Sequence, residues 1–451
     1  MGWFFGIYYL IAGGLLAAAS WEASRYLRVR RQALRDTVEL CGLHMVSISR
    51  PGASLKLAAD AGPVKVRIED IRERKREFGI RVTVAFPGPP GFTGVRIRRE
   101  AYKPPGAREV EIGDDLFDGT FYIEGPTRLL SVLLDAETRR LLVSVNAEGR
   151  LRISGGELQV ETFDVHLANL LPLLLDLTRR FSEEVDVAPR LAENARQDPN
   201  AGVRLWNLLV LLRELPGQPG TVAAIRAACA DPSLQVRLRA AMALGAEARD
   251  VLVELAETAE DDSCSAQAVS HLNRELGFER TRAILGHALR KRRHQTARAC
   301  LEVIGTSGEA AAVDLLEKVL AVEKGELAAA AALALGATGS PAAEPALLLA
   351  LRRDKADVQV AAATALGHAG SAAAVLPLKE ADQKSPDDEL RRAARQAIAQ
   401  IQSRLPGASP GQLSLSGAEE GQLSLAQAEA GQLSLAADQA GQLSLPPEGS
   451  N

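Results

Sequence analysis

The sequence predicts an α-solenoid and a small α+β domain, with one N-terminal transmembrane helix before them and a disordered C-terminal tail after them. A short helical phrase recurs five times within residues 203–405, and its closing glycines lie 28 to 32 residues apart. Such a fixed period is the signature of stacked repeats. Apolar and polar residues alternate within residues 38–185, as they do in half-buried strands. The first 21 residues carry no charged side chain.

The composition argues against several classes of protein. The 451 residues leave room for two or three domains, and the formal net charge of −4 shows no basic excess, so we expect no nucleic-acid partner. The four cysteines are far apart and form no CxxC pair, which argues against a metal site and a disulfide framework. The sequence contains no phosphate-binding loop, G-x-S-x-G elbow or HExxH motif. We therefore expect no cofactor.

Residues 1–21 predict a membrane anchor. An α-helix needs about 20 apolar residues to cross a bilayer core, and Trp3 and Trp21 suit the two interfaces. Residues 22–37 predict a basic stalk, whose positive charge places the body of the protein in the cytoplasm. We expect a single-pass protein of the bacterial inner membrane, with weak self-association of the anchor through its small residues. A signal peptide cleaved near Ala17–Ala19 is the alternative.

Residues 38–185 predict one α+β domain, because short alternating strands are separated by Pro/Gly clusters. Asp114, Asp115 and Asp118 lie together in a loop before one of these strands. Such carboxylates can bind a metal or act as catalytic acids, but more often they cap a turn. We expect the turn and keep an active site in this domain as the alternative. Residues 186–202 are polar and predict a linker.

Residues 203–405 predict the solenoid. Each unit consists of a small-residue helix, a glycine stop and a second, amphipathic helix. Asp231–Gly245 follows the pattern D-x-x-x-x-V-R-x-x-A-A-x-A-L-G. This pattern resembles HEAT repeats, specifically the short bacterial class of the phycocyanobilin lyases. The resemblance implies a stack of helix pairs that serves as a scaffold or an adaptor, and we carry over no catalytic residue because we find no candidate chromophore site.

Residues 406–451 contain GQLSL four times with a ten-residue period, and their small, acidic and amide spacers predict a disordered tail. The repetition is either a neutral product of replication slippage or a multivalent binding motif. QLSL also resembles peptides that bind the bacterial DNA sliding clamp, although each copy lacks their closing Phe. The candidate contact residues of the first two copies are Gln412, Leu413, Leu415, Gln422, Leu423 and Leu425.

The solenoid contains one dense basic cluster, formed by Arg290, Lys291, Arg292 and Arg293. A solvated helix end explains it, and the alternative is a docking patch for an acidic partner, nucleic acid or a lipid headgroup. The sequence as a whole predicts a membrane-anchored, non-enzymatic scaffold that binds a protein partner on its repeat surface. An enzyme or enzyme subunit with its site in the α+β domain is the first alternative function, and tail-mediated recruitment to DNA-associated machinery is the second.

Overall fold

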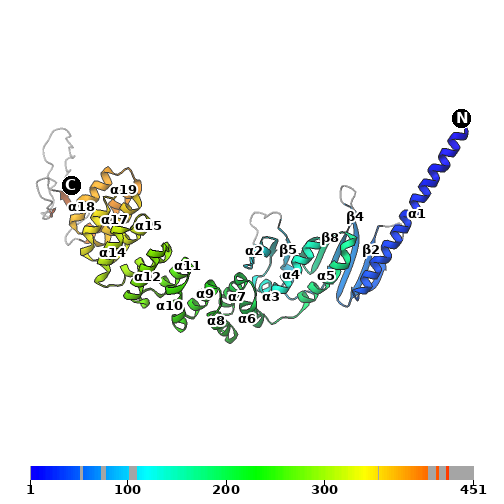
Figure 1. The fold of residues 1–451 in the computed structure, drawn as a ribbon, viewed down its shortest axis with the longest axis horizontal. Coiled ribbons are helices and arrows are strands. Elements are labelled where there is room, and N and C mark those ends of the chain that lie inside the picture. The colour runs from blue at the N-terminus through cyan, green and yellow to red at the C-terminus, as the bar shows by residue number, and fades with distance from the viewer. Residues whose placement is uncertain are drawn as a thin grey trace, which may run out of the picture. The chain divides into compact units, whose positions relative to one another are not determined.

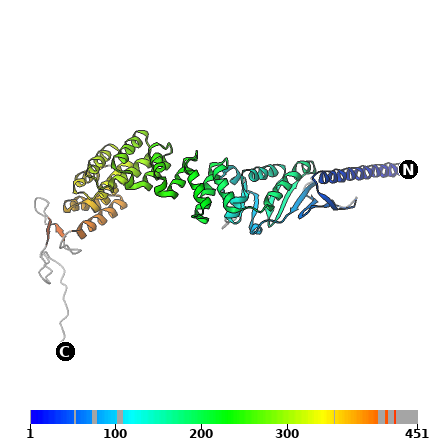
Figure 2. The same cartoon turned by 90° about the horizontal axis from the view of Figure 1, so that it is seen from below.

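The computed structural model describes residues 2–50, 54–72, 78–100, 109–353 and 355–404, together with 413–415 and 423–425. The chain divides into two compact units, Met1–Ala268 and Val269–Asn451 (Figure 1, Figure 2). The first contains an eight-stranded antiparallel sheet, and the second contains a helical array followed by a short two-stranded pair. The predicted combination of a small α+β domain and a helical array is therefore confirmed.

The first unit contains one eight-stranded antiparallel sheet, in which the strand order is β1-β2-β3-β4-β8-β7-β5-β6. Alternate residues point into the core, as the predicted period of two requires; examples are Leu151 and Ile153 of β7 and Leu158 and Val160 of β8. The strands are β1 (His44–Ile48), β2 (Lys56–Ala61), β3 (Val64–Arg72), β4 (Phe78–Ala85), β5 (Arg96–Arg99), β6 (Phe121–Glu124), β7 (Arg150–Ser154) and β8 (Glu157–Thr162).

Helix α5 (Leu167–Ser182) completes the core of the α+β domain. Leu170, Leu174 and Leu177 recur every three or four residues, and all three are fully buried in one cluster with the strands. The shorter helices of this domain are α2 (Asp115–Asp118), α3 (Thr127–Leu133) and α4 (Ala136–Glu148).

Helix α1 (Gly2–Leu40) contains both the predicted anchor and the predicted stalk. The end of the stalk is docked on the domain, because Leu34 is buried in the core and Arg30 pairs with Asp70 at 2.7 Å and with Asp164. The predicted anchor, residues 1–21, lies almost wholly in the part of α1 whose side chains are not described. Among the residues whose side chains are described, no helix combines the length and the hydropathy of a membrane span.

The linker predicted at residues 186–202 is instead the beginning of the helical array. It contains α6 (Val187–Gln197) and the start of α7 (Ala201–Glu214), and α6 buries Leu191 in a cluster that also includes Val132 of α3. The array therefore packs directly on the α+β domain. The first unit continues with α8 (Pro219–Ala228), α9 (Leu234–Leu244) and α10 (Arg249–Thr258), and α11 (Asp262–Leu272) spans the boundary.

The second unit is a stack of helices (Figure 1). They are α12 (Phe278–Lys291), α13 (His294–Gly305), α14 (Ala311–Val322), α15 (Glu326–Ala337), α16 (Glu344–Ala350), α17 (Ala356–Ala369), α18 (Val375–Lys384) and α19 (Asp388–Arg404). Helices α13, α15, α17 and α19 form a row in which each packs on the next, whereas α14, α16 and α18 pack mainly on this row.

The repeat glycines have two different roles. Gly245 and Gly277 have φ angles of 58° and 78°, which is the left-handed region, and they follow helical segments as predicted. The predicted stop is wrong for the later repeats, because their glycines belong to helices and allow neighbouring helices to touch. An added Cβ would lie 2.6 Å from the Ala334 oxygen at Gly305, 2.6 Å from the Ala365 Cα at Gly336 and 3.1 Å from the Ala397 Cα at Gly367.

The structure describes two segments of the tail. Strands β9 (Leu413–Leu415) and β10 (Leu423–Leu425) come from the first two GQLSL copies and pair antiparallel, with Leu413 opposite Leu425. These six residues pair as strands, and the rest of the tail lies outside the described residues, where the predicted disorder stays a prediction.

Candidate functional site

Two of the three loop carboxylates, Asp114 and Asp118, hold the structure of the loop. The Asp118 carboxylate accepts hydrogen bonds from the backbone N–H groups of Ile112, Gly113 and Asp114, the shortest of them 2.9 Å from Gly113. Burial raises the pKa of Asp118 although these three donors oppose the shift. Asp114 caps α2 and pairs with Arg139 at 2.9 Å, while Asp115 is exposed. Among the described residues, no group of three or more His, Cys, Asp or Glu side chains could hold a metal ion.

A chain of buried charges joins this loop to the first repeats. The Arg139 guanidinium on α4 donates to both oxygens of Asp198 at 2.9 Å, in addition to Asp114. Arg204 donates to the backbone oxygen of Asp198 at 2.8 Å and to both carboxylate oxygens of Asp231 at 2.7 and 2.8 Å. Arg139, Asp198, Arg204 and Asp231 are each at most 8% exposed. This alternating ladder fixes α6 and α7 against the α+β domain.

An open groove runs across α13, α15 and α17 and has a water-accessible volume of about 710 Å³. Its floor is apolar and consists of the outer face of α15, where Ala329, Ala330 and Ala337 surround Leu333, which is 47% exposed. Small side chains on this helix permit close packing within the row. On the side of the helix that faces solvent, they are too small to fill the space between α13 and α17. The groove is therefore a direct product of the alanine-rich repeat sequence. We call it the repeat groove.

The rim of the repeat groove carries more negative than positive charge. Glu302 on α13, Glu326 on α15 and Asp357 on α17 are exposed acidic residues, and Arg298 is the basic residue among the side chains that line it. Arg298 pairs with Glu302 at 3.1 Å, one helical turn away. The rim therefore favours a partner with positive charge.

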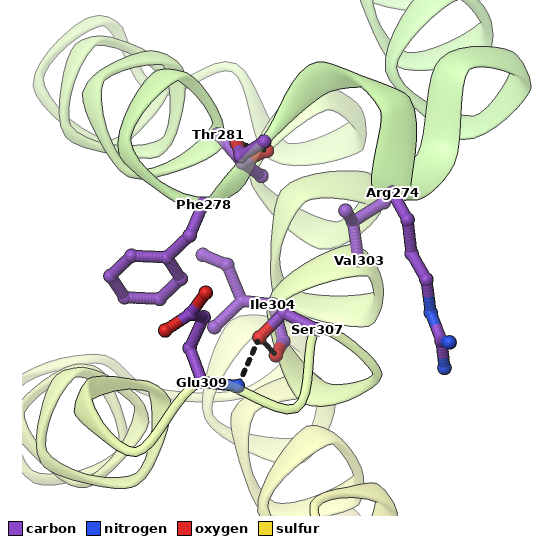
Figure 3. A pocket seen from close by; sticks show the side chains of 8 residues that line it. Arg274, Phe278, Thr281, Val303, Ile304, Ser307 and Glu309 are labelled. Carbon is purple, nitrogen blue, oxygen red and sulfur yellow. Dashed lines mark hydrogen bonds between the residues drawn. The ribbon is translucent and has the colours of Figure 1, made fainter.

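A smaller pocket of about 120 Å³ is lined by residues from 274–281 and from 303–309 (Figure 3). Val303 and Ile304 supply apolar contacts, and Phe278 and Glu309 point toward one another across the opening, whereas Arg274 points away from them (Figure 3). The backbone N–H of Glu309 donates to the Ser307 hydroxyl at 3.3 Å. This volume suits one side chain of a partner rather than an independent ligand.

The predicted basic cluster forms the end of α12. Arg292 adopts the left-handed conformation, with φ 56°, and Arg293 donates its backbone N–H to Ala288 at 2.9 Å, as in a Schellman motif. Arg290, Lys291 and Arg292 are exposed, and no residue of the cluster lines the repeat groove or the smaller pocket. The structure thus places the cluster at a solvated helix end, apart from these hollows.

The tail candidates are only partly covered by the structure. Leu413, Leu415, Leu423 and Leu425 lie in β9 and β10, where only the backbone is described. Gln412 and Gln422 lie outside the described residues. Their predicted contacts with a partner stay a prediction.

Residues 320–399 match the family of HEAT repeats. Residues 320–399 therefore carry HEAT repeats. Among solved structures, human deoxyhypusine hydroxylase in complex with glycerol is similar over 48% of this chain and 96% of that chain, with 17% identity and a TM-score of 0.22. The Escherichia coli protein YibA is similar over 48% of this chain and 98% of that chain, with 15% identity and a TM-score of 0.31. The comparison with curated proteins gives no match.

The pattern D-x-x-x-x-V-R of Asp231–Arg237 also occurs at Asp198–Arg204. Asp198 precedes Arg204 by the same spacing that separates Asp231 from Arg237, and this spacing is the sequence signal for a turn one repeat unit earlier, at residues 198–204. Arg139 pairs with Asp198 as Arg204 pairs with Asp231, so it takes the place of the arginine that a preceding repeat would supply. Nothing in the sequence around Arg139 marks this role.

Proposed function

We propose that this chain is a membrane-anchored, non-enzymatic scaffold that binds a protein partner in the repeat groove of its HEAT array. The observation that carries the proposal is the groove itself, which combines an apolar alanine and leucine floor with an acidic rim. A hollow that crosses several parallel helices suits an extended segment or an amphipathic helix of another protein. Leu333 supplies the largest apolar contact on this floor.

The use of the loop carboxylates supports a scaffold over the alternative of an enzyme. The Asp114 carboxylate pairs with Arg139 and caps α2. The Asp118 carboxylate accepts hydrogen bonds from three backbone N–H groups. Neither carboxylate is arranged as a pair with a second acid or base facing a common substrate position. Asp115 alone does not make an active site.

Site-specific photo-crosslinking tests the proposed function. A photoreactive amino acid placed at Ala330 lies in the repeat groove, and the matched control is Leu349 on α16, which is 71% exposed and does not line the groove. We expect one protein species to be crosslinked in cells from position 330 and not from position 349. The same yield from both positions, or none from position 330, contradicts a binding groove.

The anchor is part of the same proposal. The uncharged residues 1–21 and the arginines that follow them support insertion in the bacterial inner membrane with the body in the cytoplasm. Leu10→Lys places a charge in the middle of this segment, at a cost of about 3 kcal/mol. We expect the variant to leave the membrane fraction on alkaline extraction while the wild type stays. Equal extraction of both proteins contradicts the anchor.

A further inference from the structure

A second hollow lies in the first unit, where the loop before α2 meets α7. It is lined by residues between Glu111 and Leu116 on one side and between Asn200 and Leu209 on the other, and its water-accessible volume is about 600 Å³. We call it the junction groove. It shares no lining residue with the repeat groove.

The two walls of the junction groove are fixed to each other. An added Cβ at Gly113 would lie 2.5 Å from the backbone oxygen of Gly202, so the two backbones touch where only glycine fits. The buried Arg139 guanidinium ties Asp114 of one wall to Asp198, which precedes the other. A surface that is rigid before binding loses little conformational entropy when a partner docks.

The junction groove presents apolar side chains to solvent. Leu116 is 87% exposed and Leu209 is 42% exposed. Trp206 is half-buried beside them and donates its indole N–H to the Ser131 hydroxyl at 2.8 Å, which fixes the ring. The hydrogen bonds to Asp118 hold the loop in the conformation that turns Leu116 outward. Leu116 therefore serves no packing role within the fold, and a rigidly presented apolar cluster is typical of a docking surface.

The charge of the junction groove selects among partners. Glu111 and Asp115 are exposed carboxylates at its edge, and none of the described residues that line it is basic. Negative charge repels nucleic acids and anionic lipid surfaces, and it attracts lysine and arginine. Apolar contacts with an acidic edge thus favour a basic amphipathic segment.

We propose that the junction groove docks a basic amphipathic helix of a protein partner. The apolar face of that helix covers Leu116, Trp206 and Leu209, and its lysine or arginine side chains lie beside Glu111 and Asp115.

The test uses the full-length protein and a fluorescent helical peptide that has leucines three and four residues apart and lysines between them. Fluorescence anisotropy measures its affinity for the wild type, for Leu116→Ser and for the double variant Glu111→Gln, Asp115→Asn. The matched control is Val165→Ser, because Val165 is an 80% exposed residue elsewhere in the same unit. Thermal melts check that the variants are folded. We expect them to fold, because all the substituted side chains are exposed.

We expect Leu116→Ser and the double variant each to weaken binding about tenfold, with no change for Val165→Ser. Binding should also weaken as salt is added, and a peptide with glutamates in place of the lysines should not bind. Equal affinities for Leu116→Ser and Val165→Ser, or binding of the glutamate peptide, overturn the proposal. Self-association that Leu116→Ser abolishes also overturns it, because the occupant is then a second copy of this chain.

Discussion

Arg139→Met tests the ladder that joins the α+β domain to the HEAT array. The methionine keeps the volume of the side chain but removes the guanidinium that pairs with Asp114 and Asp198. The Asp198 side chain is only 2% exposed, so it is left as an almost unsolvated carboxylate. Removing one partner of a buried ion pair costs about 3–5 kcal/mol. We expect a loss of this size in the stability of the junction.

Hydrogen exchange is the appropriate assay, because it reports local opening where a single unfolding transition is not assured. Amides of residues 112–118 and of α6 should exchange at least about 100-fold faster in the variant. Arg179→Met is the matched control, since Arg179 is 70% exposed and pairs with Asp176 on the same helix. An exposed pair of this kind contributes about 0.5 kcal/mol or less.

A double variant decides between the ion pair and a general packing effect. Adding Asp198→Asn to Arg139→Met removes the charge that the first change left unpaired, so the combined loss should be clearly smaller than the sum of the two single losses. If the losses add, or if Arg139→Met exchanges no faster than Arg179→Met, the ladder does not hold the junction.

Three further predictions concern the array. Gly336→Ala places a Cβ 2.6 Å from the Cα of Ala365 and should lower the free energy of urea unfolding by about 1–3 kcal/mol. Gly220→Ala is the control and should not destabilise the protein, because nothing lies within 4 Å of the added atom. Equal effects of the two substitutions would refute the close approach of the helices at Gly336. Arg292→Gly should stabilise the protein by about 1 kcal/mol in thermal melts, because glycine adopts φ 56° without strain, and an unchanged or lower Tm would contradict this. Burial alone would raise the pKa of Asp231, but the Arg204 hydrogen bond and the Ser233 N–H lower it below its ordinary value of 3.8. The stabilisation by Asp231 is therefore present above about pH 4 and lost as the pH falls through the lowered pKa, so Asp231→Asn should flatten the acid limb of the stability profile.

The repeats could be predicted from the sequence because their signal is local. Small residues, a glycine and an amphipathic helix recur with one period, and each repeat contacts mainly its neighbours. The role of the later glycines could not be predicted in this way. A glycine after a helix and a glycine that touches the next helix look alike in the sequence, and only the packing of Gly336 on Ala365 distinguishes them.

The beginning of the array was missed because its polar residues are buried. Asn194 and Asp198 make residues 186–202 look like a linker, yet each is at most 6% exposed and hydrogen-bonded. Composition identifies a linker only where polar side chains are solvated. The repeat groove could not be predicted from the sequence either, because its lining comes from three helices that lie about 30 residues apart in the chain.

The affinity of the crosslinked partner for matched leucine variants tests the central claim most directly. Leu333→Ser removes the largest apolar contact from the floor of the repeat groove, and Leu349→Ser makes the same chemical change at an exposed residue outside it. Burying the half-exposed Leu333 side chain contributes about 1 kcal/mol, so we expect the Kd to rise roughly fivefold for Leu333→Ser. We expect no change for Leu349→Ser. Equal affinities of the two variants would contradict a partner that binds in the repeat groove.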